Sequence, residues 1–332
     1  MDTTAVYPRA ATRAGMYESF YLRAVSPERP LGVWIRYTVH KAPGRPPRGS
    51  LWCTVFDSDR GEPYMSKRTS DRLSAGGGGD WIALGESEDG GGAIGPGRAR
   101  GSCGEARWDL RFSSVEAELL HLSPRWLYRA PLPRTKLTSP APAASFDGVL
   151  ELAGRDPLEL RGWRGMVGHN WGSEHAERWI WLHGIDFGAD HRDAWLDVAL
   201  GRLRLAGRTT PWVANGVICL DGRRHPLGGL GARGLSVQES AAGCELRLPG
   251  RDGVLIEGRV AVPPRTAAGW RYADPDGGEH DVVNCSIAQL DLSVRPSAGA
   301  PPVALRSPHG GVFELGMRER DHGVALAPFS DG

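Results

Sequence analysis

The sequence predicts an all-β protein in which two antiparallel sheets close, or nearly close, on themselves. Glycine and proline, with 46 and 25 residues, make up more than a fifth of the 332-residue chain and are spread between short apolar runs, a pattern typical of many strands joined by turns. Residues 32–40 alternate like a half-buried strand, with Val33, Ile35 and Tyr37 on one face. We find no segment with the 3.6-residue apolar period of a helix sustained over about 12 residues.

The first half of the chain divides into strands, turns and one region of weak signal. Two weak strands are expected within 73–104, where glycines gather, and the proline-rich residues 124–142 are expected to form a connector. Residues 107–112 and 115–122 have the alternation of a hairpin. The other strands expected here are residues 17–25, 32–40, 50–57, 146–152 and 158–163.

The second half repeats the order of the first. The run Phe20-Tyr21-Leu22 and the later Trp34-Ile35 match Ile180-Trp181-Leu182 and Trp195-Leu196 at offsets of 160 and 161 residues. A repeat of this length indicates a duplicated domain, so we expect one domain at 15–175 and another at 176–320. The strands expected after the repeat are residues 235–239, 244–248, 254–262, 281–294 and 311–317.

Composition and charge argue against several classes of function. A formal charge of +1 makes nucleic acid an unfavourable partner. No apolar run approaches the roughly 20 residues of a membrane-spanning helix, and residues 1–15 lack the apolar core of a signal peptide. The five cysteines form no CxxC pair, and the histidines are too widely spaced for a zinc motif. We therefore expect a cytoplasmic protein without a transmembrane segment, a metal or a cofactor.

A dense polar and aromatic motif lies near the midpoint of the chain, from Gly162 to Gly184. It holds four of the twelve tryptophans and three of the ten histidines. Its glycines disfavour a helix, and an extended chain places His169 and Trp171 on one face and Asn170 on the other. Glycines in a strand are typical of places where a ligand or a second backbone comes close.

The motif carries a family resemblance. His169-Asn170-Trp171-Gly172, followed by the aromatic run 179–182, resembles the signature of the hydroxyneurosporene synthase and AttH-like proteins, whose relatives include tocopherol cyclase and some fungal Diels–Alderases. The resemblance covers about residues 15–294 and implies two lipocalin-like (calycin-like) antiparallel β-barrels in tandem, with the motif near their junction. Hydroxyneurosporene synthases tend to carry an acid just before the motif histidine, where this chain has Val167-Gly168. Here another group would donate the proton, or the chemistry differs.

The candidate catalytic residues are His169, Asn170, Glu18 and Glu174. A histidine relays protons near neutral pH, and a carboxylic acid kept neutral by an apolar wall can protonate an alkene. Two structural alternatives remain open at this stage. His169 and Asn170 could tie the two barrels together through hydrogen bonds, and the acids could pair with arginines such as Arg178.

The candidate substrate-binding residues are mostly aromatic. An aromatic face stabilises a carbocation by about 0.5–2 kcal/mol, and Trp179, Trp181 and His183 share one face of an extended strand. The alternative for Trp181 is that it plugs the closed end of a barrel. The residues expected to bind substrate are Tyr21, Trp34, Trp171, Trp179, Trp181 and His183.

These features favour an enzyme that needs no cofactor and that hydrates or cyclises a carbon–carbon double bond. Its substrate would be a hydrophobic small molecule derived from an isoprenoid or a polyketide, bound in a barrel cavity near the domain junction. The alternative is a lipocalin-like carrier that holds an apolar ligand without chemistry.

Overall fold

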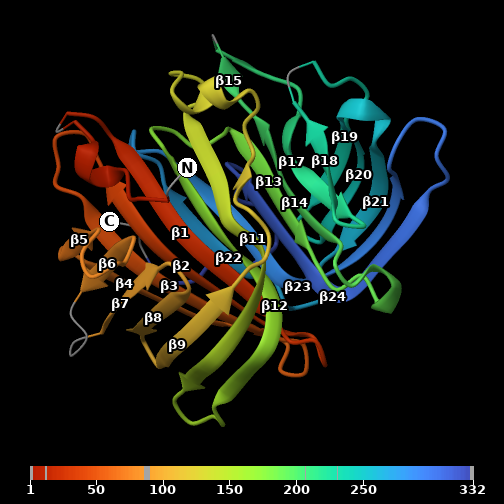
Figure 1. Cartoon of the computed structure of the whole chain (residues 1–332). Coiled ribbons are helices and arrows are strands. Elements are labelled where there is room, and N and C mark those ends of the chain that lie inside the picture. Colours follow the sequence, from red (N-terminus) through yellow and green to blue (C-terminus); the bar gives the residue numbers. More distant parts are fainter. Residues whose placement is uncertain (1–2, 12, 86–89, 206, 230, 330–332) are drawn as a thin grey trace.

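The computed structural model describes residues 3–11, 13–85, 90–205, 207–229 and 231–329. Nearly all regular structure in these residues is antiparallel strand, arranged in two large sheets, A and B, that lie side by side (Figure 1). They contain no α-helix, and none of their helices has the length and apolarity needed to cross a membrane. The all-β prediction is confirmed. The short 3-10 helices are η1 (Tyr7–Arg9), η2 (Arg125–Tyr128), η3 (Ala189–His191) and η4 (Arg251–Gly253).

Sheet A has twelve strands and curls into a nearly closed barrel. Its order is β4-β3-β2-β1-β12-β11-β9-β8-β7-β6-β5, and β10 pairs with β11. The bounds are β1 (Met16–Val25), β2 (Leu31–Lys41), β3 (Arg48–Asp57), β4 (Tyr64–Ser70), β5 (Leu73–Ala75), β6 (Ile82–Gly85), β7 (Gly91–Gly95), β8 (Arg98–Cys103), β9 (Ala106–Ser113), β10 (Leu119–Leu120), β11 (Thr135–Leu152) and β12 (Leu158–Gly172).

Sheet B has ten strands in the order β18-β17-β14-β13-β24-β23-β21-β20-β19, and β22 pairs with β23. A separate hairpin joins β15 (Arg204–Leu205) to β16 (Arg208–Thr209). The strands of the sheet are β13 (Arg178–Gly184), β14 (Trp195–Arg202), β17 (Val213–Leu220), β18 (Arg223–Gly228), β19 (Ser236–Ser240), β20 (Gly243–Pro249), β21 (Leu255–Ala261), β22 (Ala268–Ala273), β23 (Glu279–Arg295) and β24 (Val303–Met317).

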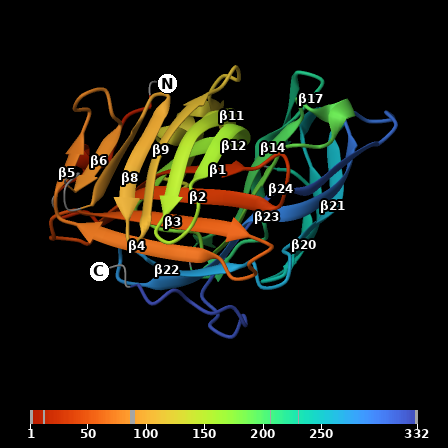
Figure 2. The same cartoon turned by 90° about the horizontal axis from the view of Figure 1, so that it is seen from below.

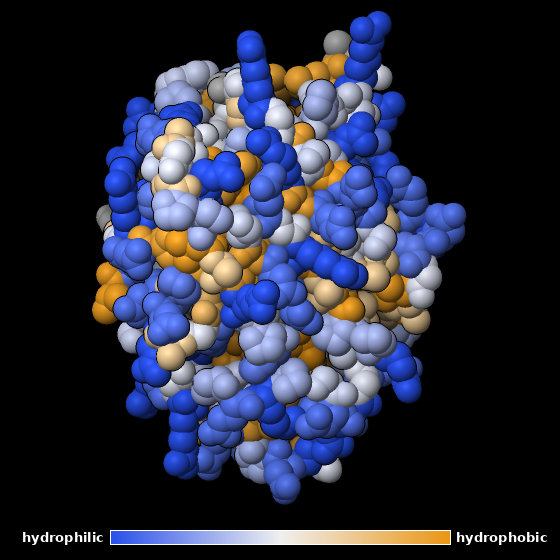
Figure 3. Space-filling view, turned by 90° about the vertical axis from the view of Figure 1, so that its right-hand side faces the viewer, coloured by the Kyte–Doolittle hydropathy of each residue, from blue (hydrophilic) through white to orange (hydrophobic). Residues whose placement is uncertain are grey.

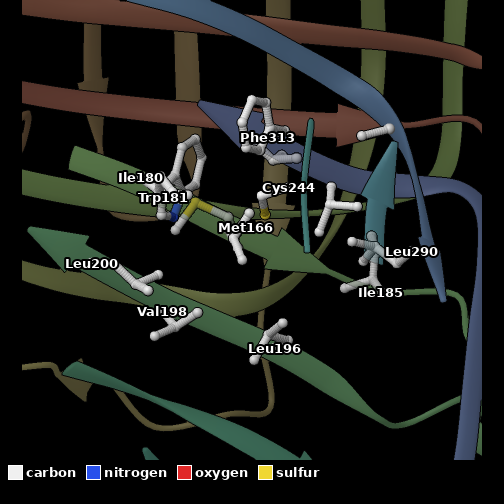
Figure 4. Close-up of a cluster of buried hydrophobic side chains, with 14 of the residues drawn as sticks. Met166, Ile180, Trp181, Ile185, Leu196, Val198, Leu200, Cys244, Leu290 and Phe313 are labelled. Carbon is white, nitrogen blue, oxygen red and sulfur yellow. The ribbon is translucent and has the colours of Figure 1, made fainter. Parts of the chain in front are cut away.

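The core of sheet B consists of aliphatic and aromatic side chains. Ile180, Val198 and Leu200 of β13 and β14 lie in one buried cluster with Phe313 of β24, and Met166 reaches this cluster from β12 of sheet A (Figure 4). The outer surface on this side of the molecule is largely hydrophilic, with small separate apolar patches (Figure 3).

The two sheets share one strand order around their first strand. In sheet A, β1 lies between β2 and β12, the last strand of that sheet; in sheet B, β13 lies between β14 and β24, likewise the last. The matched sequence runs at 20–22 and 180–182 fall on these two first strands. The chain passes from one sheet to the other between Gly172 and Arg178.

Two sequence predictions about sheet A were wrong. Residues 107–112 and 115–122 do not form a hairpin, because β9 pairs with β8 and β11, and within 115–122 only the two residues of β10 are a strand. The proline-rich connector is also shorter than predicted, because β11 already begins at Thr135. Pro140 and Pro142 fall where the β11–β12 register shifts, and such bulges tolerate a residue that cannot donate a backbone hydrogen bond.

Other strands were missed where the sequence signal is weak. The described part of 73–104 contains four strands, β5 to β8, in place of the two predicted. Strands β4, β18 and β22 were not predicted at all. All of these have at most seven residues, which is too short for alternation to stand out from chance.

The outer face of sheet A packs against sheet B, and this explains the strong signal of the first strands. On β1, Phe20 and Leu22 belong to the interior of sheet A, whereas Tyr21 belongs to the core cluster of sheet B. Every residue of β1 is buried. Strand β22 lies beneath β3 and β4 in Figure 2, and the Trp270 ring on β22 meets that of Trp52 edge-on at 4.9 Å between centroids.

A buried arginine links the two sheets. Arg23 of β1 is fully buried and donates to the backbone oxygens of Ser286 (2.9 Å) and Gly310 (3.3 Å) in sheet B. It also donates to Nδ1 of His183 (3.3 Å), whose Nε2 donates to the Pro142 oxygen (2.9 Å). Burial, and then the charge of Arg23, lower the pKa of His183 to about 4, so this histidine is neutral at pH 7.

Candidate active site

A cavity of about 390 Å³ lies between the two sheets. Strands β1, β2 and β12 form one side, strands of sheet B form the other, and residues between 122 and 137 complete the wall. Most of the lining is apolar, including Trp34, Ile180 and Leu200. Leu132 and Leu205 line the cavity and are still 46% and 43% exposed, so they mark its mouth.

Two aromatic residues of the cavity lie over glycines on the neighbouring strand. Tyr21 pairs with Gly168, and a Cβ added there would lie 2.2 Å from the tyrosine ring. Trp179 pairs in the same way with Gly316, where an added Cβ would lie 2.1 Å from the indole. The motif glycine at 168 is therefore required by the close approach of a cavity side chain.

The polar end of the cavity is built around His175. Its Nδ1 donates to Oδ1 of Asp274 (2.6 Å), which also accepts from Nδ1 of His280 (3.0 Å). Burial alone would raise the pKa of Asp274, but the hydrogen bonds from His175 and His280 hold it below its usual value. The carboxylate is therefore charged and fixes the imidazole as the Nδ1–H tautomer.

The other edge of His175 is free for chemistry. The His175 ring stacks on Tyr17 at 3.9 Å between centroids and lines the cavity. No other described residue hydrogen-bonds to it, so Nε2 keeps its lone pair. Burial lowers the pKa of His175 despite the opposing effect of Asp274, so the ring is neutral at pH 7. A neutral imidazole held by a carboxylate is the arrangement of a general base.

Among the described residues, this cluster is the candidate for holding a metal ion. One ligand atom from each of His175, Asp274 and His280 lies within 4.8 Å of the others. Both histidines, however, direct their Nδ1 atoms at a single oxygen at hydrogen-bond distances, and Nε2 of His280 is buried with no partner in the part of the chain that the structure describes. Ligating histidines usually have that second nitrogen anchored, so hydrogen bonding describes this cluster better than coordination.

Two charged groups flank Tyr272 of β22. The Arg36 guanidinium lies 4.2 Å from the Tyr272 ring centroid, and its Nε donates to the Ser19 hydroxyl (2.6 Å). On the other side, Glu314 accepts hydrogen bonds from Trp179 Nε1 (3.0 Å), Asn284 Nδ2 (3.0 Å) and the Tyr272 hydroxyl (3.5 Å). These three donors fix the position of the Glu314 carboxylate in the cavity wall.

Behind Trp181 lies a second, fully enclosed polar network. Asp197 accepts from Trp181 Nε1 (3.1 Å) and from the Ser139 hydroxyl (2.5 Å), and His121 Nε2 lies 3.3 Å from it. Burial would raise the pKa of Asp197, but His121 and the hydrogen bonds hold it below its usual value. These contacts fix the orientation of the Trp181 indole in the cavity wall.

The structure places five of the predicted site residues at the cavity. Asn170 lines it with a side-chain oxygen, Oδ1, that is buried and has no partner among the described residues. Burial raises the pKa of Tyr21, so its hydroxyl remains protonated. The five that line the cavity are Tyr21, Trp34, Asn170, Trp179 and Trp181.

His169 and Glu18 lie elsewhere, on the inner face of sheet A. His169 Nε2 contacts Oε1 of Glu18 at 2.7 Å, between the rings of Phe20 and Trp171. Glu18 also accepts from the backbone N–H groups of Val6 (2.8 Å) and Tyr7 (2.7 Å). This pair fastens the N-terminal segment to the sheet.

The remaining three predicted residues are also outside the cavity lining. Glu174 is paired with Arg134. Trp171 stacks on His169 at 4.5 Å, and His183 is held between Arg23 and Pro142.

The sequence did not identify His175, Arg36, Asp274, Tyr272 or Glu314 as site residues. Two of them carried a usable signal, because Arg36 lies within the apolar run 33–39 and Glu314 within 312–317, and a charge in such a run is expensive to bury. Asp274 follows β22 and had no such signal.

These features define a class: an antiparallel two-sheet protein with a mostly apolar cavity and a histidine–carboxylate pair between the sheets. No family model matches the sequence. An uncharacterised protein of Mycobacterium tuberculosis, present in two strains, is 25% identical over 304 residues, which cover 88% of this chain and 85% of the relative.

Two solved structures share the fold. One is a protein of Nitrosomonas europaea assigned as an AttH, with a TM-score of 0.55 and 14% identity over 95% of this chain and 97% of that one. The other is kievitone hydratase from Nectria haematococca, with a TM-score of 0.54 and 12% identity over 92% and 89% of the two chains. Both similarities are similarities of fold.

Proposed function

We propose that the protein is a hydratase that adds water to a carbon–carbon double bond of a hydrophobic small molecule in the inter-sheet cavity. The observation that carries this proposal is the His175–Asp274 pair, which presents a neutral Nε2 to a cavity with mostly apolar walls. The similarity in fold to kievitone hydratase supports it. An isoprenoid- or polyketide-derived substrate fits the aromatic lining.

In this mechanism His175 takes a proton from water and returns it to the substrate. Asp274 holds Nδ1–H and stabilises the imidazolium that forms, so one histidine serves as base and then as acid. Such a positioned base contributes roughly 10²- to 10⁴-fold to the rate.

The cavity does not suit the carbocation route that the sequence suggested. Protonation of an unactivated alkene needs a neutral carboxylic acid, but Glu18 and Glu174 do not line the cavity and Glu314 accepts three hydrogen bonds. The guanidinium of Arg36 would also repel a cation in this space. A cyclisation that proceeds through a carbocation is disfavoured for the same reason.

The test is water addition with isotopic labelling. Candidate alkenes of suitable size are incubated with the protein in H₂¹⁸O, and product mass is measured. We expect labelled alcohol with the wild type and a loss of at least 100-fold in rate for His175→Gln. Glu174→Gln, a neighbouring change outside the cavity, should retain the wild-type rate. If His175→Gln turns over normally, His175 is not the base.

The apolar walls and the leucine-rich mouth also favour a second candidate, a carrier of an apolar ligand. A carrier would release its ligand unchanged after long incubation, as judged by native mass spectrometry, whereas the hydratase would release a product 18 mass units heavier in ordinary water.

A further inference from the structure

Arg36 is a buried cation that forms no ion pair with the described residues. Its side chain belongs to a residue that is only 6% exposed, and no carboxylate of the described residues forms an ion pair with it. Within the described part of the chain, its one hydrogen bond runs from Nε to the Ser19 hydroxyl. The two terminal nitrogens of the guanidinium keep some accessible surface. Arg36 lines the cavity, which is where that surface lies. Its free N–H donors therefore face the cavity.

Such an arrangement needs an acceptor. A buried charge is costly unless it is paired or hydrogen-bonded, and the aromatic rings around Arg36 offer no lone pair. Tyr272 lies 4.2 Å from the guanidinium carbon, with Trp52 at 5.7 Å and Trp34 at 5.9 Å. These rings fix the guanidinium plane and leave its fork of donors for an oxygen atom of a ligand.

Arg36 and His175 stand near one another across a single residue. The centroid of the His175 ring is 6.3 Å from that of Tyr272, on whose ring Arg36 also rests. A planar substrate could bridge the two groups if its oxygen and its reacting carbon are a few bonds apart. The oxygen would then lie at Arg36 and the carbon next to Nε2 of His175.

We propose that the substrate is an α,β-unsaturated carbonyl compound whose carbonyl oxygen binds Arg36, so that hydration proceeds through an enolate. This inference rests on the proposed function and specifies its substrate class. It differs from the carbocation route, because the charge that develops is negative and lies beside a fixed cation.

The step is balanced by water alone. The oxygen of water forms a bond to the β-carbon while one of its protons moves to Nε2 of His175. The π electrons of the double bond shift, giving an enolate whose oxygen accepts hydrogen bonds from Arg36. The proton on Nε2 is then delivered to the α-carbon, which restores the carbonyl and the neutral imidazole.

The test is a binding preference that needs no turnover. The ligands are 4-phenylbut-3-en-2-one and its hydrocarbon isostere 3-methyl-1-phenylbut-1-ene, and affinity is followed by quenching of the cavity tryptophans. Because a hydrogen bond to a charged group is strong, Arg36→Met should reduce the ratio of ketone affinity to hydrocarbon affinity by roughly 10- to 100-fold. Affinity for the hydrocarbon should change less than about threefold.

Lys67→Met is the matched control. Lys67 is a buried cation over the same Trp52 ring, with Nζ 4.1 Å from its centroid, but it does not line the cavity. Its removal should leave the preference unchanged. Should Arg36→Met fail to fold by circular dichroism, Arg36→Lys takes its place, and the loss of the two-pronged fork should still lower the preference several-fold.

The outcomes separate this inference from the proposed function. A preference that survives in both Arg36 variants, or that falls equally in Lys67→Met, overturns the role of Arg36. A preference that depends on Arg36 without any hydration supports carbonyl binding and counts against the hydratase. Hydration of an unconjugated alkene at a rate independent of Arg36 overturns the enolate route.

Discussion

Two histidine–carboxylate pairs lie six residues apart in the chain and differ in almost everything except their hydrogen-bond length. His169 meets Glu18 at 2.7 Å, and His175 meets Asp274 at 2.6 Å. The first pair is closed off by the rings of Phe20 and Trp171 and by the N-terminal segment. In the second pair, His175 lines a cavity between the sheets.

The difference comes from the faces of one strand and the turn that follows it. His169 opposes Phe20 in the β1–β12 register and therefore points into sheet A. His175 lies beyond the end of β12, where the chain crosses to sheet B and meets the segment after β22. A histidine that is hydrogen-bonded to a carboxylate thus has a structural role at His169 and a reactive role at His175. The difference is whether other side chains enclose the imidazole or a cavity lies beside it.

Exchange of each histidine for glutamine gives the largest expected contrast. His175→Gln should lower the hydration rate by roughly 10²- to 10⁴-fold with little change in melting temperature, whereas His169→Gln should lose stability and keep its rate per folded molecule. The wild-type rate should be constant from pH 8 to near 6.5 and fall only below that value, because burial lowers the pKa of His175. Asp274 raises this pKa, whereas the charges of His280 and Arg36 lower it further. Equal rate losses in the two variants would contradict the contrast.

A third histidine extends the comparison to pH-dependent stability. The pKa of His183 is about 4 in the folded protein, against about 6.5 when unfolded, so the unfolded chain binds more protons between these values. About 3 kcal/mol of stability should therefore be present above pH 6.5 and be lost as the pH falls towards 4. Arg23, Asp197 and Arg164 are the charged groups that act on it. Urea unfolding at several pH values should show a flatter profile for His183→Gln; identical profiles would argue against this assignment.

The smallest expected effect is the contribution of the Glu18–His169 contact to stability. In a double-mutant cycle of Glu18→Gln and His169→Gln, we expect a coupling energy of about 1–2 kcal/mol in unfolding free energy, because both side chains share one buried contact. Hydration by the folded fraction should not change in any of the three variants. A coupling near zero would mean that Glu18 is held by the Val6 and Tyr7 amides alone.

The sequence predicted best where a strand is buried on both faces. The ranges 17–25, 32–40 and 50–57 nearly match β1, β2 and β3, because alternating aromatic residues serve two cores at once. Glycine-rich β5 to β8 and the proline-interrupted start of β11 gave no comparable pattern.

The site was harder to predict, for a physical reason. Trp179 and Trp181 were identified because rings gather in sequence around the motif, and both do line the cavity. Asp274 lies about a hundred residues from His175, and only the pairing of sheets A and B brings them together. The motif led to the prediction of His169, which is enclosed by other side chains. The histidine that lines the cavity is His175, six residues further along the chain.

The contacts of Arg23 have a consequence for how a ligand reaches the cavity. A guanidinium whose acceptors belong to the opposite sheet prevents the two halves from swinging apart as a hinge, since opening would strand a charge in an apolar seam. Admission must then occur at the rim near Leu132 and Leu205. The gate of this protein would be a pair of leucines, and bulkier side chains at those two positions would slow the entry and exit of ligand while leaving the chemistry intact.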